Sequence, residues 1–231
     1  MSKLILFDID GTLLHTAGAG RRAICEALSV RFGVFGVFDS VRFDGKTDPQ
    51  IVHELLSVAG HTATAAADEV REICDAYVEL LEVELSRRNG AVHLYPGVEL
   101  LLDRLSARGD AIVGLLTGNV ERGARLKLRS VGLDPNQFRV GAFGSDAAER
   151  DRLPVIAQDR ATSLLGRRPE GDDVVIIGDT PADVTCGASI RARAIGVATG
   201  SYTSAELAAA GAYAVFGDMC ETDAVEAAIF G

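Results

Sequence analysis

The sequence contains 231 residues, of which 48% are hydrophobic and 24% are charged, and its formal net charge at pH 7 is −10. These fractions are close to those of globular proteins, so they exclude a disordered chain and a fibrous repeat. The length suffices for one large domain or for a core with a smaller insertion. The negative charge repels polyanions and the Lys and Arg residues are scattered, so we expect no nucleic acid as a partner.

Cysteine spacing and the lengths of the apolar runs indicate the compartment. Cys25, Cys74, Cys186 and Cys220 lie far apart and form no CxxC pair, which favours reduced thiols that pack as small apolar side chains. The first residues, MSKLILFDIDG, reach acidic side chains before an apolar run long enough for a signal peptide. No stretch approaches the ~18 apolar residues of a membrane span. We therefore expect a cytoplasmic protein with no membrane partner.

The first predicted element is a buried strand over the apolar run from Lys3 to Phe7. The motif FDIDGT follows this run, and Gly11 permits the chain to turn where the strand ends. Asp8 and Asp10 therefore lie at the carboxyl end of the first strand.

Residues from about 15 to about 91 show helical periodicity. The apolar groups that share helix faces are Ile24, Ala27, Leu28 and Phe32; Ile51, Leu55 and Ala59; and Val70, Ile73, Cys74, Tyr77 and Leu81. We therefore predict an inserted helical domain over residues 15–91 and a core formed by residues 1–14 and 92–231.

After Tyr95-Pro96-Gly97 the chain alternates between helical stretches and the apolar runs AIVGLLTGN, VGAFG, DVVIIGD, AIGVATG and AYAVFGD. This alternation predicts an α/β fold: a Rossmann-like parallel sheet with helices on both faces, plus the inserted helical domain. LILFDID, IVGLLTGN and VVIIGD all end in polar residues, and ligands of such sheets bind outside the carboxyl ends of the strands. We expect these strand ends to form one crevice, with the helical segment beside it as a lid.

Asp8 and Asp10 are the candidate catalytic residues. A carboxylate at an exposed strand end can attack phosphorus and form an acyl-phosphate, which water later hydrolyses. A second carboxyl group can protonate the leaving alkoxide and then activate that water.

The two acids and a phosphate dianion would repel one another, so the site needs a cation. Mg²⁺ suits it, because this ion prefers hard oxygen ligands and retains several waters. The segment DVVIIGDTPADV supplies two further carboxylates. We expect Asp179 to bind the ion directly and Asp183 to act through a water or from outside the inner coordination sphere.

The run LLTGN supplies a candidate phosphate cradle. Thr117 offers a hydroxyl group, and Gly118 and Asn119 add backbone amides close to a helix start. A basic side chain is also needed to neutralise the phosphoryl oxygens in the transition state. Arg150 and Arg152, which precede a predicted helix, are the candidates.

FDIDGT, LLTGN, an arginine before a helix and GDTPADV, in this order, resemble the four motifs of the haloacid dehalogenase superfamily. The likeness covers essentially the whole chain and is greatest to phosphoglycolate phosphatase-like members with a helical cap of the C1 type. The resemblance implies a phosphatase in which Asp8 is the nucleophile and Asp10 is the acid and base. It also implies that Mg²⁺ is held by Asp8, the carbonyl oxygen of Asp10, and Asp179.

The third motif departs from the family pattern. The family usually has lysine followed by proline, whereas this sequence reads ERDRLP. The spacing to the helix favours Arg150 over Arg152, and arginine can hold phosphate oxygens bidentately. The dehalogenases of the superfamily lack the second aspartate, so Asp10 favours phosphate chemistry.

The segment FDGKTDPQI resembles the loop that faces the catalytic site in this type of cap. Lys46, Thr47 and Asp48 are therefore candidates for contact with the substrate, and Thr47 is our main choice. An equally good use of Thr47 or Asp48 is to cap the helix expected near Pro49, and the two roles are compatible.

The leading functional prediction is the hydrolysis of a small phosphate monoester, such as a phosphoglycolate-like compound or a sugar phosphate. A phosphomutase of the β-phosphoglucomutase type is the alternative, and it would require a cap that keeps water away from the acyl-phosphate. A phosphonoacetaldehyde hydrolase would need a Schiff base on a cap lysine such as Lys46. A binding protein without catalysis is the remaining class. The expected partner is a small phosphorylated metabolite, and the sequence does not decide the oligomeric state.

Overall fold

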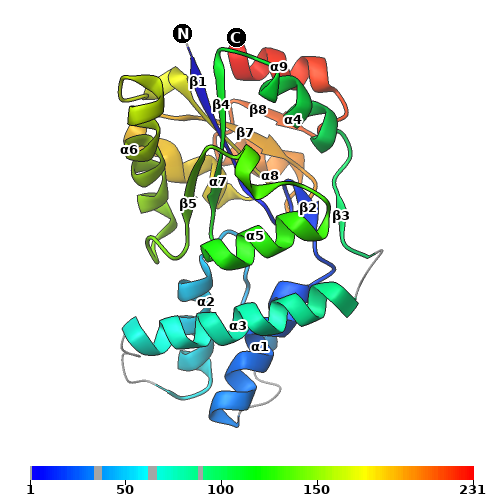
Figure 1. The fold of residues 1–231 in the computed structure, drawn as a ribbon, viewed down its shortest axis with the longest axis vertical. Coiled ribbons are helices and arrows are strands. Elements are labelled where there is room, and N and C mark those ends of the chain that lie inside the picture. The colour runs from blue at the N-terminus through cyan, green and yellow to red at the C-terminus, as the bar shows by residue number, and fades with distance from the viewer. Residues whose placement is uncertain (1, 34–37, 62–66, 88–90) are drawn as a thin grey trace.

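The computed structural model describes residues 2–33, 38–61, 67–87 and 91–231 and consists of two parts (Figure 1). A parallel sheet with helices around it forms the upper part, and three helices, α1 to α3, form the lower part. Both chain termini lie at the top, at the end of the sheet away from the three helices. The predicted α/β class with inserted helices is confirmed.

Six parallel strands form the main sheet, in the order β5-β4-β1-β6-β7-β8. The strands are β1 (Lys3–Phe7), β4 (Ala111–Thr117), β5 (Val140–Phe143), β6 (Val174–Gly178), β7 (Arg193–Val197) and β8 (Ala214–Phe216). Strand β1 is central, because Phe7 pairs with Leu115 of β4 on one side and with Ile177 of β6 on the other. The strands that end in LFDID, LLTGN and IIGD are therefore neighbours.

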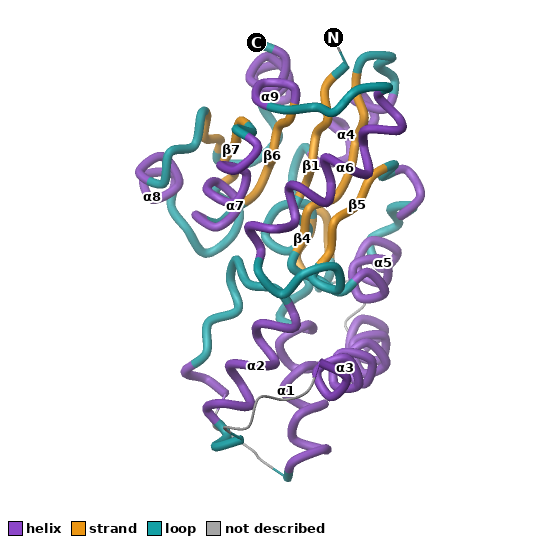
Figure 2. The backbone as a smooth tube through the Cα atoms, turned by 90° about the vertical axis from the view of Figure 1, so that its left-hand side faces the viewer, coloured by secondary structure: helices purple, strands orange, loops and turns teal. Residues whose placement is uncertain are grey.

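Helices cover both faces of this sheet, whose strands lie side by side in the view of Figure 2. The helices are α4 (Val98–Ser106), α5 (Glu121–Ser130), α6 (Leu153–Leu165), α7 (Pro181–Cys186), α8 (Ser204–Ala209) and α9 (Thr222–Phe230). Ile5 and Phe7 pack in a core with residues of α4, α5 and α9, whereas Leu4 and Leu6 pack in another with residues of α6. This alternation along β1 explains its continuous apolar run, because a strand buried on both faces has no polar side.

Five short 3₁₀ helices complete the described helical elements: η1 (Phe38–Ser40), η2 (Pro135–Gln137), η3 (Arg150–Arg152), η4 (Gly171–Asp173) and η5 (Gly187–Ile190). Of these, η3 leads directly into α6. It carries both arginines that the sequence offered as phosphate ligands.

The inserted helices are α1 (Ala19–Phe32), α2 (Asp48–Val58) and α3 (Ala67–Arg87). They bury their own apolar core, which includes Ile24, Leu28, Leu55, Ile73, Tyr77 and Leu81. The chain crosses between the two parts along β2 (Leu14–His15) and β3 (His93–Leu94), which pair antiparallel. The boundaries predicted at 14/15 and 91/92 stay a prediction.

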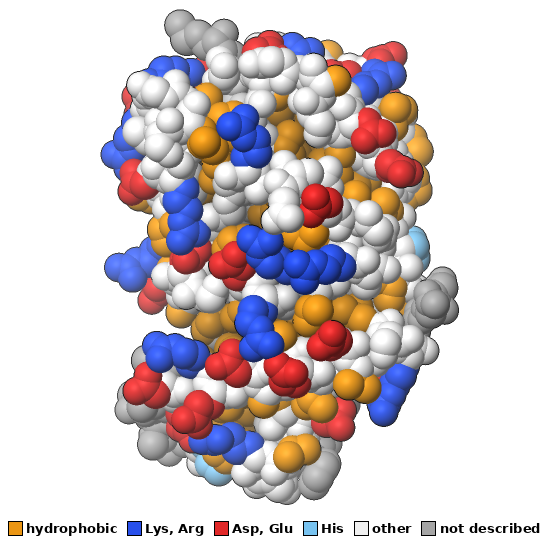
Figure 3. Space-filling model, viewed as in Figure 1, with side chains coloured by type: hydrophobic (Ala, Val, Ile, Leu, Met, Phe, Trp, Pro, Cys, Tyr) orange, Lys and Arg blue, Asp and Glu red, His pale blue; other side chains and the backbone are white. Residues whose placement is uncertain are grey.

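The surface is of mixed charge. Figure 3 shows acidic and basic side chains intermingled over one face of the molecule. In the described part of the chain, no helix combines the length and apolarity that a membrane crossing requires.

Candidate active site

The ends of β1, β4 and β6 bring three sequence-predicted residues to one edge of the sheet. Asp8 follows β1, Thr117 ends β4, and Asp179 follows β6. A cavity of about 730 Å³ opens at this edge, and these three side chains line it together with Asp10, Asn119 and Arg150. The crevice predicted at the strand ends is therefore present.

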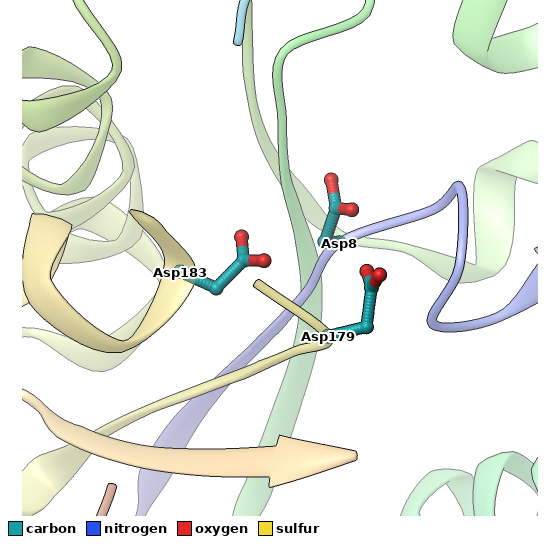
Figure 4. Close-up of side chains that lie close together, drawn as sticks. All are labelled: Asp8, Asp179 and Asp183. Carbon is teal, nitrogen blue, oxygen red and sulfur yellow. The ribbon is translucent and has the colours of Figure 1, made fainter. Parts of the chain in front are cut away.

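Asp8, Asp179 and Asp183 form what we call the acidic cluster (Figure 4). One carboxylate oxygen from each residue lies within 4.8 Å of those of the other two. The three side chains are buried, with exposed fractions of 6%, 4% and 1%. Asp183 comes from the first turn of α7, where its Oδ2 accepts hydrogen bonds from the backbone N–H and the hydroxyl of Thr180.

Burial gives the acidic cluster unusual electrostatics. It raises the pKa of Asp8 above the ordinary value; the guanidinium of Arg150 opposes this rise, and the carboxylate of Asp183 adds to it. The pKa of Asp179 is also raised by burial and then by the carboxylates of Asp183 and Asp8. Three acids therefore share a space that is unfavourable for negative charge, which is the situation that a bound cation relieves.

Arg150 supplies the positive side chain next to the acidic cluster. Its guanidinium lies 3.1 Å from Oδ1 of Asp8 and also forms an ion pair with Asp183. Burial disfavours the charged form of Arg150, but the carboxylates of Asp183 and Asp8 outweigh this effect and raise its pKa. Arg152 points into solvent, where 70% of its side chain is exposed beside Glu149. The structure therefore places Arg150, and not Arg152, at the cavity.

Thr117, Gly118 and Asn119 form the turn that leaves β4. Thr117 is fully buried, and its Oγ1 accepts a hydrogen bond of 2.8 Å from Nδ2 of Asn119. Gly118 is required by close packing, because a Cβ there would lie 2.0 Å from the carbonyl oxygen of Lys46. The turn therefore packs closely against the inserted segment, and its phosphate-binding role stays a prediction.

The carboxyl group of Asp10 lines the same cavity as Asp8 and Asp179 and is held by side chains outside the acidic cluster. Its Oδ2 accepts hydrogen bonds from Nδ2 of Asn119 at 2.8 Å and from Nζ of Lys127 at 2.6 Å. We call Asp10, Asn119 and Lys127 the Lys127 cluster. Gly11, with φ +82°, makes the turn that separates Asp8 from the rest of the loop, and a Cβ there would lie 2.3 Å from Oδ2 of Asp179.

The loop before α2 docks onto the core. Thr47 is completely buried; its hydroxyl donates to the carbonyl of Ala148 at 2.6 Å and accepts from the N–H of Gln50. Thr47 therefore caps α2, as one of its two predicted roles required. It is not among the residues that line the cavity, whereas Lys46 and Asp48 are. Contact between Thr47 and a substrate stays a prediction.

Asp48 joins the inserted helices to the turn after β4. Its backbone N–H donates to the carbonyl of Gly118 at 2.8 Å, and its Oδ2 accepts from the N–H of Val120 at 2.8 Å. Burial raises the pKa of Asp48 to about 6, although the ammonium of Lys127 and the hydrogen bond from Val120 counteract the rise.

Lys127 lies outside the motifs that the sequence offered as candidate sites. The buried face of α5 is formed by Gly123, Ala124, Lys127 and Leu128. A lysine in the middle of an otherwise apolar helix face was the available signal, because lysine is almost never fully buried unless it is paired.

Comparisons with known proteins agree with this geometry. Residues 5–188 match the model of the haloacid dehalogenase-like hydrolase family. Phosphoglycolate phosphatase from Rhodospirillum rubrum is 30% identical over 225 residues, which cover 95% of this chain and 88% of that protein.

Solved structures show the same fold. CbbY from Rhodobacter sphaeroides in complex with phosphate is similar with a TM-score of 0.74 and 21% identity over 96% of each chain. A variant of CbbY in complex with xylulose-1,5-bisphosphate gives a TM-score of 0.74 and 22% identity, again over 96% of each chain. The family match over most of the sequence and the relative that spans nearly all of it show that the chain belongs to the haloacid dehalogenase-like hydrolase family, as one of its phosphatases.

Proposed function

We propose that the protein hydrolyses a small phosphate monoester with the help of Mg²⁺ and forms an aspartyl-phosphate on Asp8. The observation that carries this proposal is the position of Asp8, which lies in the cavity between the guanidinium of Arg150 and the carboxylate of Asp179. A candidate acid and base, Asp10, lines the same cavity.

The acidic cluster fits a magnesium ion. Among the described residues, the three buried carboxylates form ion pairs with the guanidinium of Arg150 alone, which leaves an excess of negative charge. Carboxylate and carbonyl oxygens are the ligands that Mg²⁺ prefers. We propose that Asp8, Asp179 and the carbonyl oxygen of Asp10 hold the ion, with Asp183 next to them. When bound, Mg²⁺ would neutralise charge between the carboxylates and the phosphoryl group.

The residues of the chain then divide the chemistry between them. A carboxylate oxygen of Asp8 attacks phosphorus, the bond to the ester oxygen breaks, and that oxygen receives its proton from Asp10. Arg150 lies where it can stabilise the phosphoryl oxygens, and the turn at Thr117 can offer its hydroxyl and amides to them. Asp10 next takes a proton from water, the water oxygen attacks phosphorus, and Asp8 is released.

The proposed substrate class is a small phosphorylated metabolite. A cavity of about 730 Å³ has room for phosphoglycolate and for a sugar phosphate, and the relative from Rhodospirillum rubrum is a phosphoglycolate phosphatase. Cys74, Cys186 and Cys220 form no disulfide in the structure, in line with the reducing conditions of the cytoplasm, where we propose that the enzyme acts.

A phosphatase screen tests this function. Purified protein is incubated with a panel of metabolite monoesters that includes 2-phosphoglycolate and hexose phosphates, with Mg²⁺ or with EDTA, and free phosphate is measured. We expect release with Mg²⁺ only. Release of no phosphate from any ester by folded protein contradicts the proposal, and conversion of glucose 1-phosphate to its isomer without free phosphate favours the phosphomutase.

A further inference from the structure

The buried ammonium group of Lys127 lines the cavity and donates hydrogen bonds to Asp10 and Asn119. Only 4% of the residue is exposed, although it lies on α5, a helix at the surface of the core. Its Nζ lies 2.6 Å from Oδ2 of Asp10. Burying an ammonium group is costly unless it is paired, so a lysine retained at such a place must be held by its partners.

The contacts of Lys127 close a triangle. Nζ donates to Oδ1 of Asn119 as well as to Asp10, and Nδ2 of Asn119 donates to the same Oδ2 of Asp10. Asp10 therefore has two donors on one carboxylate oxygen. Its other oxygen, Oδ1, has only a 3.5 Å contact with the hydroxyl of Thr16 among the described residues. The two oxygens of Asp10 are thus in different situations.

The inserted helices cover this triangle. A Cβ on Gly20 of α1 would lie 3.3 Å from Nζ of Lys127 and 3.7 Å from the hydroxyl of Tyr77, which belongs to α3. Asp48, at the start of α2, lines the same cavity as Lys127. All three inserted helices therefore contribute to the surroundings of the amine, which limits access of water to it.

We infer that Lys127 is a positioning residue for Asp10: with Asn119 it fixes Oδ2, so that Oδ1 is the oxygen that exchanges the proton. This inference rests on the proposed function. As Asp8 attacks phosphorus and the ester bond breaks, the bonding electrons pass to the ester oxygen. The proton on Oδ1 of Asp10 moves to that oxygen, and Lys127 and Asn119 stabilise the carboxylate that forms. In the second step Oδ1 takes a proton from the attacking water.

The test compares two kinds of leaving group in the variant Lys127→Met. The alkoxide of 2-phosphoglycolate or glycerol 3-phosphate needs a proton when it leaves, whereas the phenolate of 4-nitrophenyl phosphate leaves well without one. The ratio kcat/KM reports the steps up to formation of the aspartyl-phosphate. We expect K127M to lower kcat/KM for the alkyl phosphates at least about tenfold more than for 4-nitrophenyl phosphate. Equal losses on both would overturn the inference.

Two further variants separate positioning from general damage. Arg129→Met removes an exposed charge from the same helix and should leave both ratios unchanged. If Lys127 acts through Asp10, the double variant D10N/K127M should be no slower on alkyl phosphates than D10N alone. The reason is that D10N already removes the proton transfer that Lys127 assists. Additive losses count against the inference.

A structural measurement does not depend on activity. In a crystal structure of K127M, the carboxyl group of Asp10 should leave its position while Asp8 and Asp179 keep theirs. An unmoved Asp10 overturns the inference even if the assays succeed. A wild-type protein that releases no phosphate from any probe contradicts the proposed function instead, and the crystallographic comparison then still decides whether Lys127 positions Asp10.

Discussion

The acidic cluster and the Lys127 cluster line the same cavity but differ in the balance of their buried charges. Asp8, Asp179 and Asp183 have one guanidinium between them and raised pKa values at Asp8 and Asp179. In the Lys127 cluster, the ammonium group pairs directly with the carboxylate of Asp10. The first cluster is drawn entirely from the core, and the second is covered by the inserted helices.

This difference in charge balance suits the acidic cluster to binding an ion and the Lys127 cluster to holding a side chain in place. A cluster whose charges the protein balances keeps its shape without a ligand, because every buried polar group already has a partner. A cluster with excess negative charge is strained until a cation or a proton arrives. This contrast is why we propose ion binding for the acidic cluster and orientation of a side chain for the Lys127 cluster.

The largest effect is expected at the nucleophile. Asp8→Asn should reduce phosphate release by on the order of 10⁴-fold or more, because the acyl-phosphate can no longer form. The same change should stabilise metal-free protein, since it removes one of three crowded carboxylates. Phosphate assays and thermal unfolding in EDTA measure the two effects. Asp159→Asn, at an exposed ion pair with Arg168, is the matched control. An active D8N enzyme would contradict the assignment.

A smaller effect is expected when the guanidinium of Arg150, which pairs with the acidic cluster, is removed. Arg150→Met should lower the free energy of unfolding by ~3–5 kcal/mol in EDTA, because it leaves buried carboxylates without their partner. Mg²⁺ should restore part of the lost stability, because the ion neutralises the carboxylates in place of the guanidinium. Arg152→Met should change stability by less than about 0.5 kcal/mol, because that side chain is exposed. Urea unfolding with and without Mg²⁺ measures both, and equal losses in the two variants would refute the distinction.

The junction between the core and the inserted helices should show an intermediate effect. Asp48→Ala leaves the buried N–H of Val120 without an acceptor and should cost ~1–3 kcal/mol in stability. Asp48→Asn retains an oxygen that can accept this hydrogen bond, so we expect it to cost less. Chemical denaturation at pH 7 compares them. If the alanine and asparagine variants lose the same stability, the hydrogen bond to Val120 is not what holds the junction.

A further prediction concerns how the stability of metal-free protein depends on pH. Asp8 and Asp179 have raised pKa values in the folded state, so between about pH 4 and neutrality the folded protein binds more protons than the unfolded chain. The free energy of unfolding should therefore fall as the pH rises, by at most ~1.4 kcal/mol per pH unit for each group. Mg²⁺ should flatten the slope. Denaturation in EDTA from pH 4.5 to 7.5 measures it, and a stability that increases over this range contradicts the charge excess.

The fold and the acidic cluster could be predicted because their signals are local. The runs that became β1, β4 and β6 are apolar over most of their length, since these strands are buried on both faces, and polar residues lie at the carboxyl end of each of them. Parallel strands then place those polar residues at one edge whatever the details of the connections. Asp8 and Asp179 could be brought together by this rule alone.

The remaining features depend on contacts between distant segments. Arg150 and Arg152 are two residues apart in η3, and only the packing of this turn against α7 decides which one reaches Asp8. The partner of the Thr47 hydroxyl, the carbonyl of Ala148, lies 101 residues away. In the sequence Lys127 looks like an ordinary exposed lysine of a surface helix. Its burial depends on the packing of α1 and α3, which come from a distant part of the chain.

The central position of β1 also has a consequence for how the protein is made. Its hydrogen-bonding neighbours, β4 and β6, begin only at Ala111 and Val174, so the earliest strand to emerge during synthesis must wait for both. Such long-range pairing slows folding. Asp8 acquires Asp179 and Asp183 as neighbours only after residue 183 has left the ribosome, so we expect shorter nascent chains to lack phosphatase activity.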